Sequence, residues 1–206
     1  AQPIILEDIL KIPLKSGTSG KDPTMKKSYL WITFGIFVAM AALGGTASAA
    51  TITVTFHKVQ TERANGLGEI VGMIVFQDTA RGLKIMPNLK GLSEGRHGTH
   101  VHQNPDCGPK MKGGKLVGGL AAGSHFDPKK SGKHLGPHGG GHLGDLPLLY
   151  VDSNGRATRT SYAPALKLSD LKGRAIVIHS GGDNHSDIPK KLGGGGSRAA
   201  CGVVVY

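Results

Sequence analysis

Short segments in which polar and apolar residues alternate recur from residue 51 to the end of the chain. In Thr51–Phe56, threonines alternate with Ile52, Val54 and Phe56. A period of two turns one set of side chains toward a core and the other toward solvent, which predicts a half-buried β-strand. Similar segments predict strands at 69–77, 81–86, 96–102, 148–151, 157–161, 174–179 and 201–206, and helical periodicity is confined to one turn at 168–171.

Turn residues separate these segments. Asp152-Ser153-Asn154-Gly155 lies between the predicted strands 148–151 and 157–161. The Asn-Gly pair readily adopts the positive φ angles of a tight hairpin, so we expect these two strands to pair. Short antiparallel strands joined by such turns predict an all-β fold, either a sandwich or a flattened barrel.

Two long segments, 103–146 and 181–197, lack a strand pattern. Structureless loops of this length normally count against an assignment. The first, however, contains a group of histidines and Cys107, and the second contains a GGGG run and leads to Arg198. Cross-links through metal ions or a disulfide would offset the entropy that such loops lose on ordering.

Residues 25–49 have the three parts of a secretory signal peptide. Two lysines follow Met25, a fifteen-residue apolar stretch covers 29–43, and Ala-Ser-Ala stands at 47–49. A membrane anchor is the alternative, but the apolar stretch is shorter than the roughly 20 residues of a spanning helix. We therefore expect three parts: an upstream extension of no clear role (1–24), a signal peptide (25–49) and one domain (50–206).

The domain 50–206 has 157 residues, enough for a single core, and carries 20 basic and 11 acidic side chains, a formal net charge of +9. Such a charge can indicate binding to nucleic acid or to an anionic membrane. No run of Lys or Arg exceeds two residues, however, and the aromatic residues that stack on bases are scarce. We therefore expect no nucleic-acid partner and no stable membrane association after signal cleavage.

Seven of the ten histidines lie between residues 97 and 145, among glycines and prolines. Imidazole is the commonest metal ligand among side chains, and a histidine cluster on loop-like backbone indicates a metal site more than a core. His100 and His102 flank Val101. Because residues i and i+2 share one face of a strand, both imidazoles should point the same way and Val101 should point into the interior.

The motifs HGTHVH, AGSHFDP, KHLGP, GHLGDLP, IVIHSGGDNHSD and GGGGSRAACGVV follow one another in this order. Together they resemble copper,zinc superoxide dismutase, and most of all its periplasmic bacterial branch. The resemblance covers roughly residues 51–206. Thr99 departs from it, because the family usually has phenylalanine there. That difference concerns packing beside the copper site rather than ligation.

The resemblance implies a Greek-key flattened β-barrel or sandwich of about eight antiparallel strands with two long loops, a metal-binding loop and an electrostatic loop. It also implies two ligand sets that share His125 as a bridging imidazolate. Copper would be bound by His100, His102, His125 and His179, and structural zinc by His125, His134, His142 and Asp145. Four imidazoles suit Cu(II), and a closed set of three histidines and one carboxylate suits zinc.

Other residues receive roles in the same way. Asp183 resembles a carboxylate that hydrogen-bonds one copper and one zinc histidine. The two cysteines, if exported, indicate a disulfide rather than two free thiols, and the resemblance pairs Cys107 with Cys201. His138 competes with His142 as a zinc ligand, but only His142 has the required spacing to Asp145. We expect His97 to be an interior hydrogen-bonding residue, and His57 and His185 to be surface residues.

The activity implied is dismutation of the superoxide anion to dioxygen and hydrogen peroxide in the periplasm. Arg198 would attract and hold the anion, since a guanidinium stays charged, and His125 would carry a proton. The alternative is a non-catalytic copper- or zinc-binding or buffering protein of the same fold. The family's periplasmic members include dimers and monomers, so a homodimer is one of two alternatives.

Overall fold

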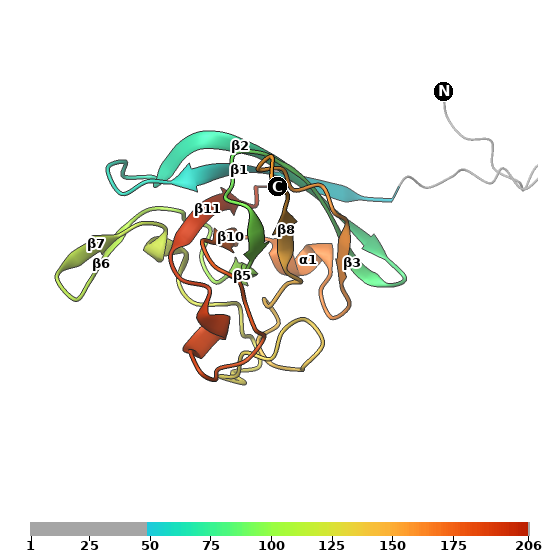
Figure 1. Ribbon diagram of the computed structural model, residues 1–206. Coiled ribbons are helices and arrows are strands. Elements are labelled where there is room, and N and C mark those ends of the chain that lie inside the picture. Colours follow the sequence, from blue (N-terminus) through green and yellow to red (C-terminus); the bar gives the residue numbers. More distant parts are fainter. Residues whose placement is uncertain (1–48, 206) are drawn as a thin grey trace, which may run out of the picture. The chain divides into compact units, whose positions relative to one another are not determined.

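The computed structural model describes residues 49–205, shown in colour in Figure 1. The predicted upstream extension (1–24), nearly all of the predicted signal peptide (25–49) and Tyr206 lie outside the described residues. Within the described part of the chain, no helix is long and apolar enough to cross a membrane.

Seven strands form one curled antiparallel sheet. They are β1 (Thr51–Val59), β2 (Leu67–Thr79), β3 (Gly82–Leu89), β5 (Thr99–His102), β9 (Ser161–Ala163), β10 (Ala175–His179) and β11 (Arg198–Val203). Their order in the sheet is β5-β10-β11-β1-β2-β3-β9, so the last long strand pairs with the first. The curled arrangement is visible in Figure 1 and confirms the expected all-β fold.

Four further strands and three short helices complete the described part of the chain. β4 (Gly95–His97) pairs with β8 (Leu149–Val151), and β6 (Lys110–Lys112) pairs with β7 (Lys115–Val117). The helices are α1 (Leu168–Leu171) and two 3-10 turns, Leu120–Ala122 and Lys191–Gly194. The expectation of strand-free structure in 103–146 was therefore wrong at β6 and β7. Gly113 and Gly114 both have positive φ there, as a tight hairpin turn requires.

The strand predicted at 96–102 is divided into β4 and β5, which lie in different sheets. The break falls at Gly98, whose N–H donates to the carbonyl of Gly181. A Cβ at Gly98 would lie 3.2 Å from the Cβ of Asp183, so the missing side chain leaves room for that carboxylate. The division therefore brings the second long loop against the histidine strand.

The hairpin predicted around Asn154-Gly155 was also wrong. A turn does form at 152–155, but β8 pairs with β4, while β9 begins only at Ser161 and pairs with β3. Of the predicted strand 157–161, Ala157 forms an isolated bridge with Leu89. Asp152 Oδ1 accepts hydrogen bonds from the N–H groups of Asn154 and Arg156, and this contact shapes the turn locally instead of joining two strands.

The core lies on the inner face of the curled sheet and follows the predicted alternation. Val54 and Phe56 of β1 are fully buried, as are Ile74 and Phe76 of β2. Burial of a side chain of this size stabilises the fold by about 1.5–3 kcal/mol. Val101 is also fully buried in this core, as predicted from its position between two histidines.

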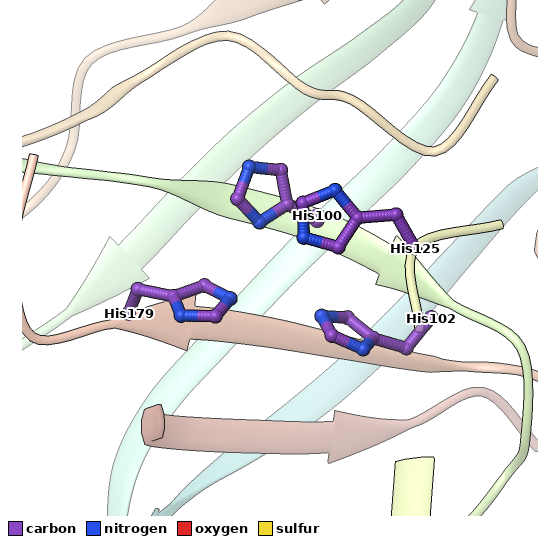
Figure 2. Close-up of side chains that lie close together, drawn as sticks. All are labelled: His100, His102, His125 and His179. Atoms are coloured by element: carbon purple, nitrogen blue, oxygen red, sulfur yellow. The ribbon is translucent and has the colours of Figure 1, made fainter. Parts of the chain in front are cut away.

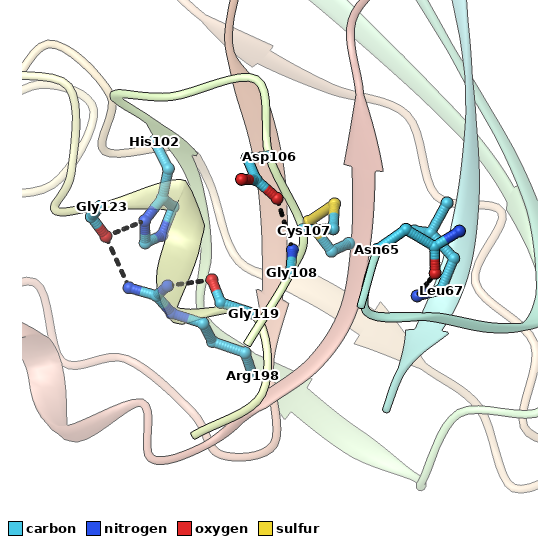
Figure 3. The surroundings of a disulfide bond; sticks show 10 residues. Asn65, Leu67, His102, Asp106, Cys107, Gly108, Gly119, Gly123 and Arg198 are labelled. Atoms are coloured by element: carbon cyan, nitrogen blue, oxygen red, sulfur yellow. Dashed lines mark hydrogen bonds between the residues drawn. A yellow bond between two sulfur atoms is a disulfide. The ribbon is translucent and has the colours of Figure 1, made fainter. Parts of the chain in front are cut away.

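A second cluster of buried residues surrounds the disulfide between Cys107 and Cys201, together with Ala122, Ala175 and Val177. The bridge joins the first long loop to β11 across a Cα–Cα distance of 5.9 Å (Figure 3). It closes a sequence separation of 94 residues, which corresponds to at most about 4–5 kcal/mol in the chain-entropy description. The predicted pairing of the two cysteines is confirmed.

Candidate metal centre

Four histidines converge at the edge of the curled sheet, as Figure 2 shows. They are His100 and His102 on β5, His179 at the end of β10, and His125 on the first long loop. One ring nitrogen of each lies within 4.8 Å of the others, and all four residues are buried. Strands β5 and β10 are neighbours, with Val177 opposite His100, so the backbone ladder itself brings three of the rings together.

Hydrogen bonds fix the orientation of these rings. His100 Nε2 lies 2.7 Å from Asp183 Oδ2, and the Nδ1 atoms of His102 and His179 lie 2.9 Å and 3.2 Å from backbone carbonyls. Each of these nitrogens must therefore carry the proton and donate it. The opposite nitrogens, His100 Nδ1, His102 Nε2 and His179 Nε2, are buried without a hydrogen-bond partner among the described residues. A metal ion would satisfy all three lone pairs at once.

Burial also keeps these imidazoles neutral. Desolvation lowers the pKa of His100 to about 3 and that of His179 to about 4, and it lowers the pKa of His102 well below its usual value. Metal binding requires the neutral imidazole. The three rings are therefore in their ligating form throughout the neutral pH range.

A second group surrounds the carboxylate of Asp145. Its oxygens lie 3.0 Å from His125 Nδ1, 2.9 Å from His134 Nδ1 and 3.4 Å from His142 Nδ1. Four residues each offer one possible ligand atom, and these four atoms lie within 4.8 Å of one another: His100, His125, His134 and Asp145. Of the predicted zinc ligands, the structure thus gathers His125, His134 and Asp145 tightly, and His142 lies beside Asp145 at a greater distance.

His134 lies between two carboxylates. Burial opposes its protonation, but hydrogen bonds to Asp145 and Asp183 raise its pKa to about 9. The same contacts with histidines hold the pKa of both aspartates below the usual range, although burial acts in the opposite direction. At neutral pH, His134 therefore holds a proton that a metal ion would have to replace.

Asp183 connects the two groups. Its Oδ2 accepts from His100 Nε2, and its Oδ1 lies 2.8 Å from His134 Nε2 and accepts from the backbone N–H of His185. A carboxylate that fixes one ring from each group sets the orientation of both. Sequence analysis predicted this role for Asp183 but not the gap at Gly98 that admits it.

Arg198 stands at the start of β11, near His102 of the sheet edge (Figure 3). Its guanidinium donates to the carbonyls of Gly119 and Gly123, and Gly123 O also accepts from His102 Nδ1. Its positive charge adds to burial in lowering the pKa of His102 and His179. The arginine is therefore coupled to the ring of His102 through one carbonyl.

The remaining histidines lie elsewhere. His97 is buried, with its two nitrogens 2.7 Å and 2.8 Å from the carbonyls of His179 and Ser93, as expected for an interior residue. His138 is exposed. His57 and His185, both expected at the surface, are half-buried, and the ring centroid of His185 lies 6.3 Å from that of His134.

Sequence reasoning missed the backbone groups that orient the rings. These are the carbonyls of Gly123 and Gly196, which accept hydrogen bonds from His102 and His179. Because every residue has a backbone carbonyl, no pattern in the sequence marks these two. The departure at Thr99 places a buried hydroxyl, without a partner in the described part of the chain, beside the core residues Ile74 and Phe76. Ligand contacts are unaffected, because Thr99 points to the opposite face from His100.

Comparison with known proteins gives a consistent result. Residues 70–204 match the family described as copper/zinc superoxide dismutase (SODC). The chain is 49% identical over 168 residues to "Superoxide dismutase [Cu-Zn] 2" of Salmonella typhimurium, covering 81% of this chain and 95% of the relative. It is 49% identical over 186 residues to the Pasteurella multocida enzyme, covering 87% and 100%.

Solved structures agree with these relatives. The copper/zinc superoxide dismutase of Brucella abortus superposes with a TM-score of 0.73 at 45% identity, covering 76% of this chain and all of that one. The monomeric copper, zinc superoxide dismutase of Salmonella enterica superposes with a TM-score of 0.67 at 49% identity and the same coverage. Both the fold and the sequence lead to one conclusion: the chain belongs to the copper/zinc superoxide dismutase family.

Proposed function

We propose that the protein is a superoxide dismutase that converts two superoxide anions and two protons into dioxygen and hydrogen peroxide. One observation carries this proposal: three buried ring nitrogens, each with its tautomer fixed from behind, converge without a partner among the described residues. Family membership supports the same activity. Within this family, such a donor set suits copper, and the neighbouring set around Asp145 suits zinc.

We assign the copper ligand atoms by the ring nitrogens that lack a hydrogen bond, and the zinc ligand atoms by their distance from Asp145. Copper would be held by His100 Nδ1, His102 Nε2 and His179 Nε2, together with His125. Zinc would be held by the Nδ1 atoms of His125, His134 and His142 and by the carboxylate of Asp145. Distances of 2.9–3.4 Å from Asp145 to the three Nδ1 atoms support the second set.

Copper held by these four histidines would supply the one-electron redox chemistry that dismutation requires. The residues of the chain do the rest. Arg198 attracts and orients the anion through a charge that persists at any working pH, and two carbonyl contacts hold its guanidinium in place. His125 belongs to both sets, so its nitrogen on the copper side is the atom at which a proton can be held between the two half-reactions.

The direct test is a gel activity stain for superoxide removal on purified, metal-loaded protein. We expect a cleared band that cyanide abolishes, since cyanide binds copper. A protein that retains both metals but clears no superoxide would instead be a metal-binding or buffering protein of this fold.

We also propose that residues 25–49 direct export and that the mature protein starts at Ala50 in the periplasm. The two lysines after Met25, the apolar stretch 29–43 and Ala-Ser-Ala at 47–49 support this proposal. Amino-terminal sequencing of exported protein tests this, and an intact residue 25 would contradict it.

A homodimer stays a prediction. Sedimentation of the metal-loaded protein distinguishes it from a monomer such as the Salmonella enterica enzyme. A mass near one chain at micromolar concentration would contradict it.

A further inference from the structure

A small hollow opens beside the proposed zinc set, and none of the proposed copper histidines lines it. Asp127, Lys129, Gly140, Gly141 and His142 belong to its lining, and it encloses about 80 Å³. A space of this size holds water molecules and therefore also a partly hydrated ion. It lies at the first long loop, between the glycines of 139–141 and the segment after His125.

His142 differs from the other members of the proposed zinc set. Its side chain is 10% exposed, whereas those of His125, His134 and Asp145 are 0–2% exposed. Its Nδ1 also lies farthest from Asp145, at 3.4 Å. Of the four ligands, His142 is thus the one that forms a wall between the metal site and the hollow.

We propose that zinc enters and leaves through this hollow, with Asp127 as the first carboxylate that binds it and His142 as the ligand that moves aside. This inference rests on the zinc set of the proposed function. A carboxylate oxygen is a normal zinc ligand. Asp127 is held at the rim by hydrogen bonds from Ser131 Oγ (3.1 Å) and the Gly132 N–H (2.8 Å), and each oxygen keeps a lone pair for a passing cation.

The opening on the copper side has the opposite character. It is lined by His179 with Lys190, Lys191 and Leu192, and none of its lining residues belongs to the proposed zinc set. Two lysines favour an anion and repel a divalent cation. The two openings thus separate the anionic substrate from the zinc ion, and of these two the hollow at His142 combines a carboxylate with contact to a proposed zinc ligand.

Zinc exchange kinetics of the mature, copper-loaded protein test the route, with zinc ion alone as the probe and a colorimetric chelator as the readout. Asp127→Asn should slow zinc uptake about five-fold at low salt, and Lys129→Glu should speed it by a similar factor. Both effects should shrink as salt is added. Ala165→Phe, which narrows the hollow from its outer wall, should slow uptake and release together and leave the equilibrium zinc affinity unchanged.

Asp152→Asn is the matched control. Asp152 also organises a surface turn through its carboxylate, by accepting from two backbone N–H groups, but it does not line the hollow. Its zinc kinetics should equal those of the unmodified protein. A fall in uptake for Asp127→Asn together with unchanged Asp152→Asn supports the route.

Unchanged rates in Lys129→Glu and Ala165→Phe, with full zinc content, would overturn the route and leave the zinc set intact. So would zinc uptake that stops when copper is bound, because the ion would then pass through the copper side. An unmodified protein that binds no zinc at this site would overturn the zinc set, and the route with it. If Asp127→Asn disturbs the turn that contains Asp127, the Lys129→Glu variant still tests the route.

Discussion

The proposed copper and zinc ligands are positioned by different parts of the molecule. His100, His102 and His179 stand on neighbouring strands whose ladder runs through Val177 opposite His100. His134, His142 and Asp145 belong to the first long loop, which is joined to β5 by two isolated bridges, His100↔Asp145 and His102↔His125. A backbone ladder therefore places three of the four proposed copper ligands. The proposed zinc ligands are placed by the two isolated bridges and by side-chain contacts to Asp145 and Asp183.

This difference has a consequence for the metal-free protein. His100, His102 and His179 are neutral and oriented by acceptors behind them, so we expect the removal of copper to change the structure little. The zinc residues are held instead by a protonated His134 between two carboxylates, an arrangement that zinc replaces. We expect the strand-borne site to be preorganised and the loop-borne site to depend on its metal.

The largest effect should come from removing a copper ligand on the sheet. His179→Ala should lower dismutase activity to below about one hundredth, because it deletes one of three preorganised nitrogens. Zinc content and fold should be retained, since His179 belongs only to the copper group. Activity and metal content measured on the same sample decide this, and near-normal turnover with copper bound would disprove the assignment.

The zinc loop should respond differently. His142→Ala should lower zinc affinity at least about 100-fold and loosen the loop 103–146, measured as faster amide hydrogen exchange. His138→Ala is the control, because His138 is exposed in the same loop. Metal analysis that ranks the two variants the other way would exchange their roles.

The sequence predicted best what depends on neighbouring residues. The alternation in Thr51–Phe56 correctly identified both the strand and its buried face, and the spacing of His100 and His102 around Val101 correctly placed two rings on one side. The disulfide and the shared group around His125 depended on the family resemblance, because no local pattern pairs residues that are 94 positions apart.

The failures have a common physical reason. The division of 96–102 falls at Gly98, which lies against the distant Asp183, and the strands beside Asn154-Gly155 pair with β4 and β3 instead of with each other. The hairpin of β6 and β7 is exposed on both strands, so it lacks the apolar alternation that identifies a buried face. Tertiary partners, which a local pattern does not contain, decided each case.

A third prediction compares the pH dependence of the two sites. Zinc must displace the proton of His134, whose pKa is raised to about 9, so zinc affinity should rise about tenfold per pH unit up to that pH and then level off. The pKa values of His100 and His179 are lowered to about 3 and about 4, so copper displaces almost no proton from them above about pH 5, one unit above the higher value. The number of protons released per metal ion, measured during metal titration in weak buffer, tests this prediction. Equal proton release at both sites would contradict it.

The smallest effects should come from Arg198, which touches neither group of ligands directly. Arg198→Glu should lower the second-order rate with superoxide about tenfold at low salt, with both metals retained, because it reverses the charge met by the anion. The loss should shrink at about 0.15 M salt, where the screening length is near 8 Å.

Arg198→Lys isolates the geometry from the charge. It keeps one positive charge but loses the planar fork that donates to both Gly119 and Gly123, so we expect a loss smaller than that of the Glu variant yet measurable. Because Gly123 O also accepts from His102, part of this loss should persist at high salt, where steering is screened.

Lys112→Glu, on the exposed hairpin, makes the same charge reversal away from the Arg198–Gly123 contact and serves as the control. Pulse-radiolysis rates against salt, with copper and zinc counted in each variant, separate the two contributions. Equal rates for the unmodified protein and Arg198→Glu at low salt would show that this arginine does not attract the anion.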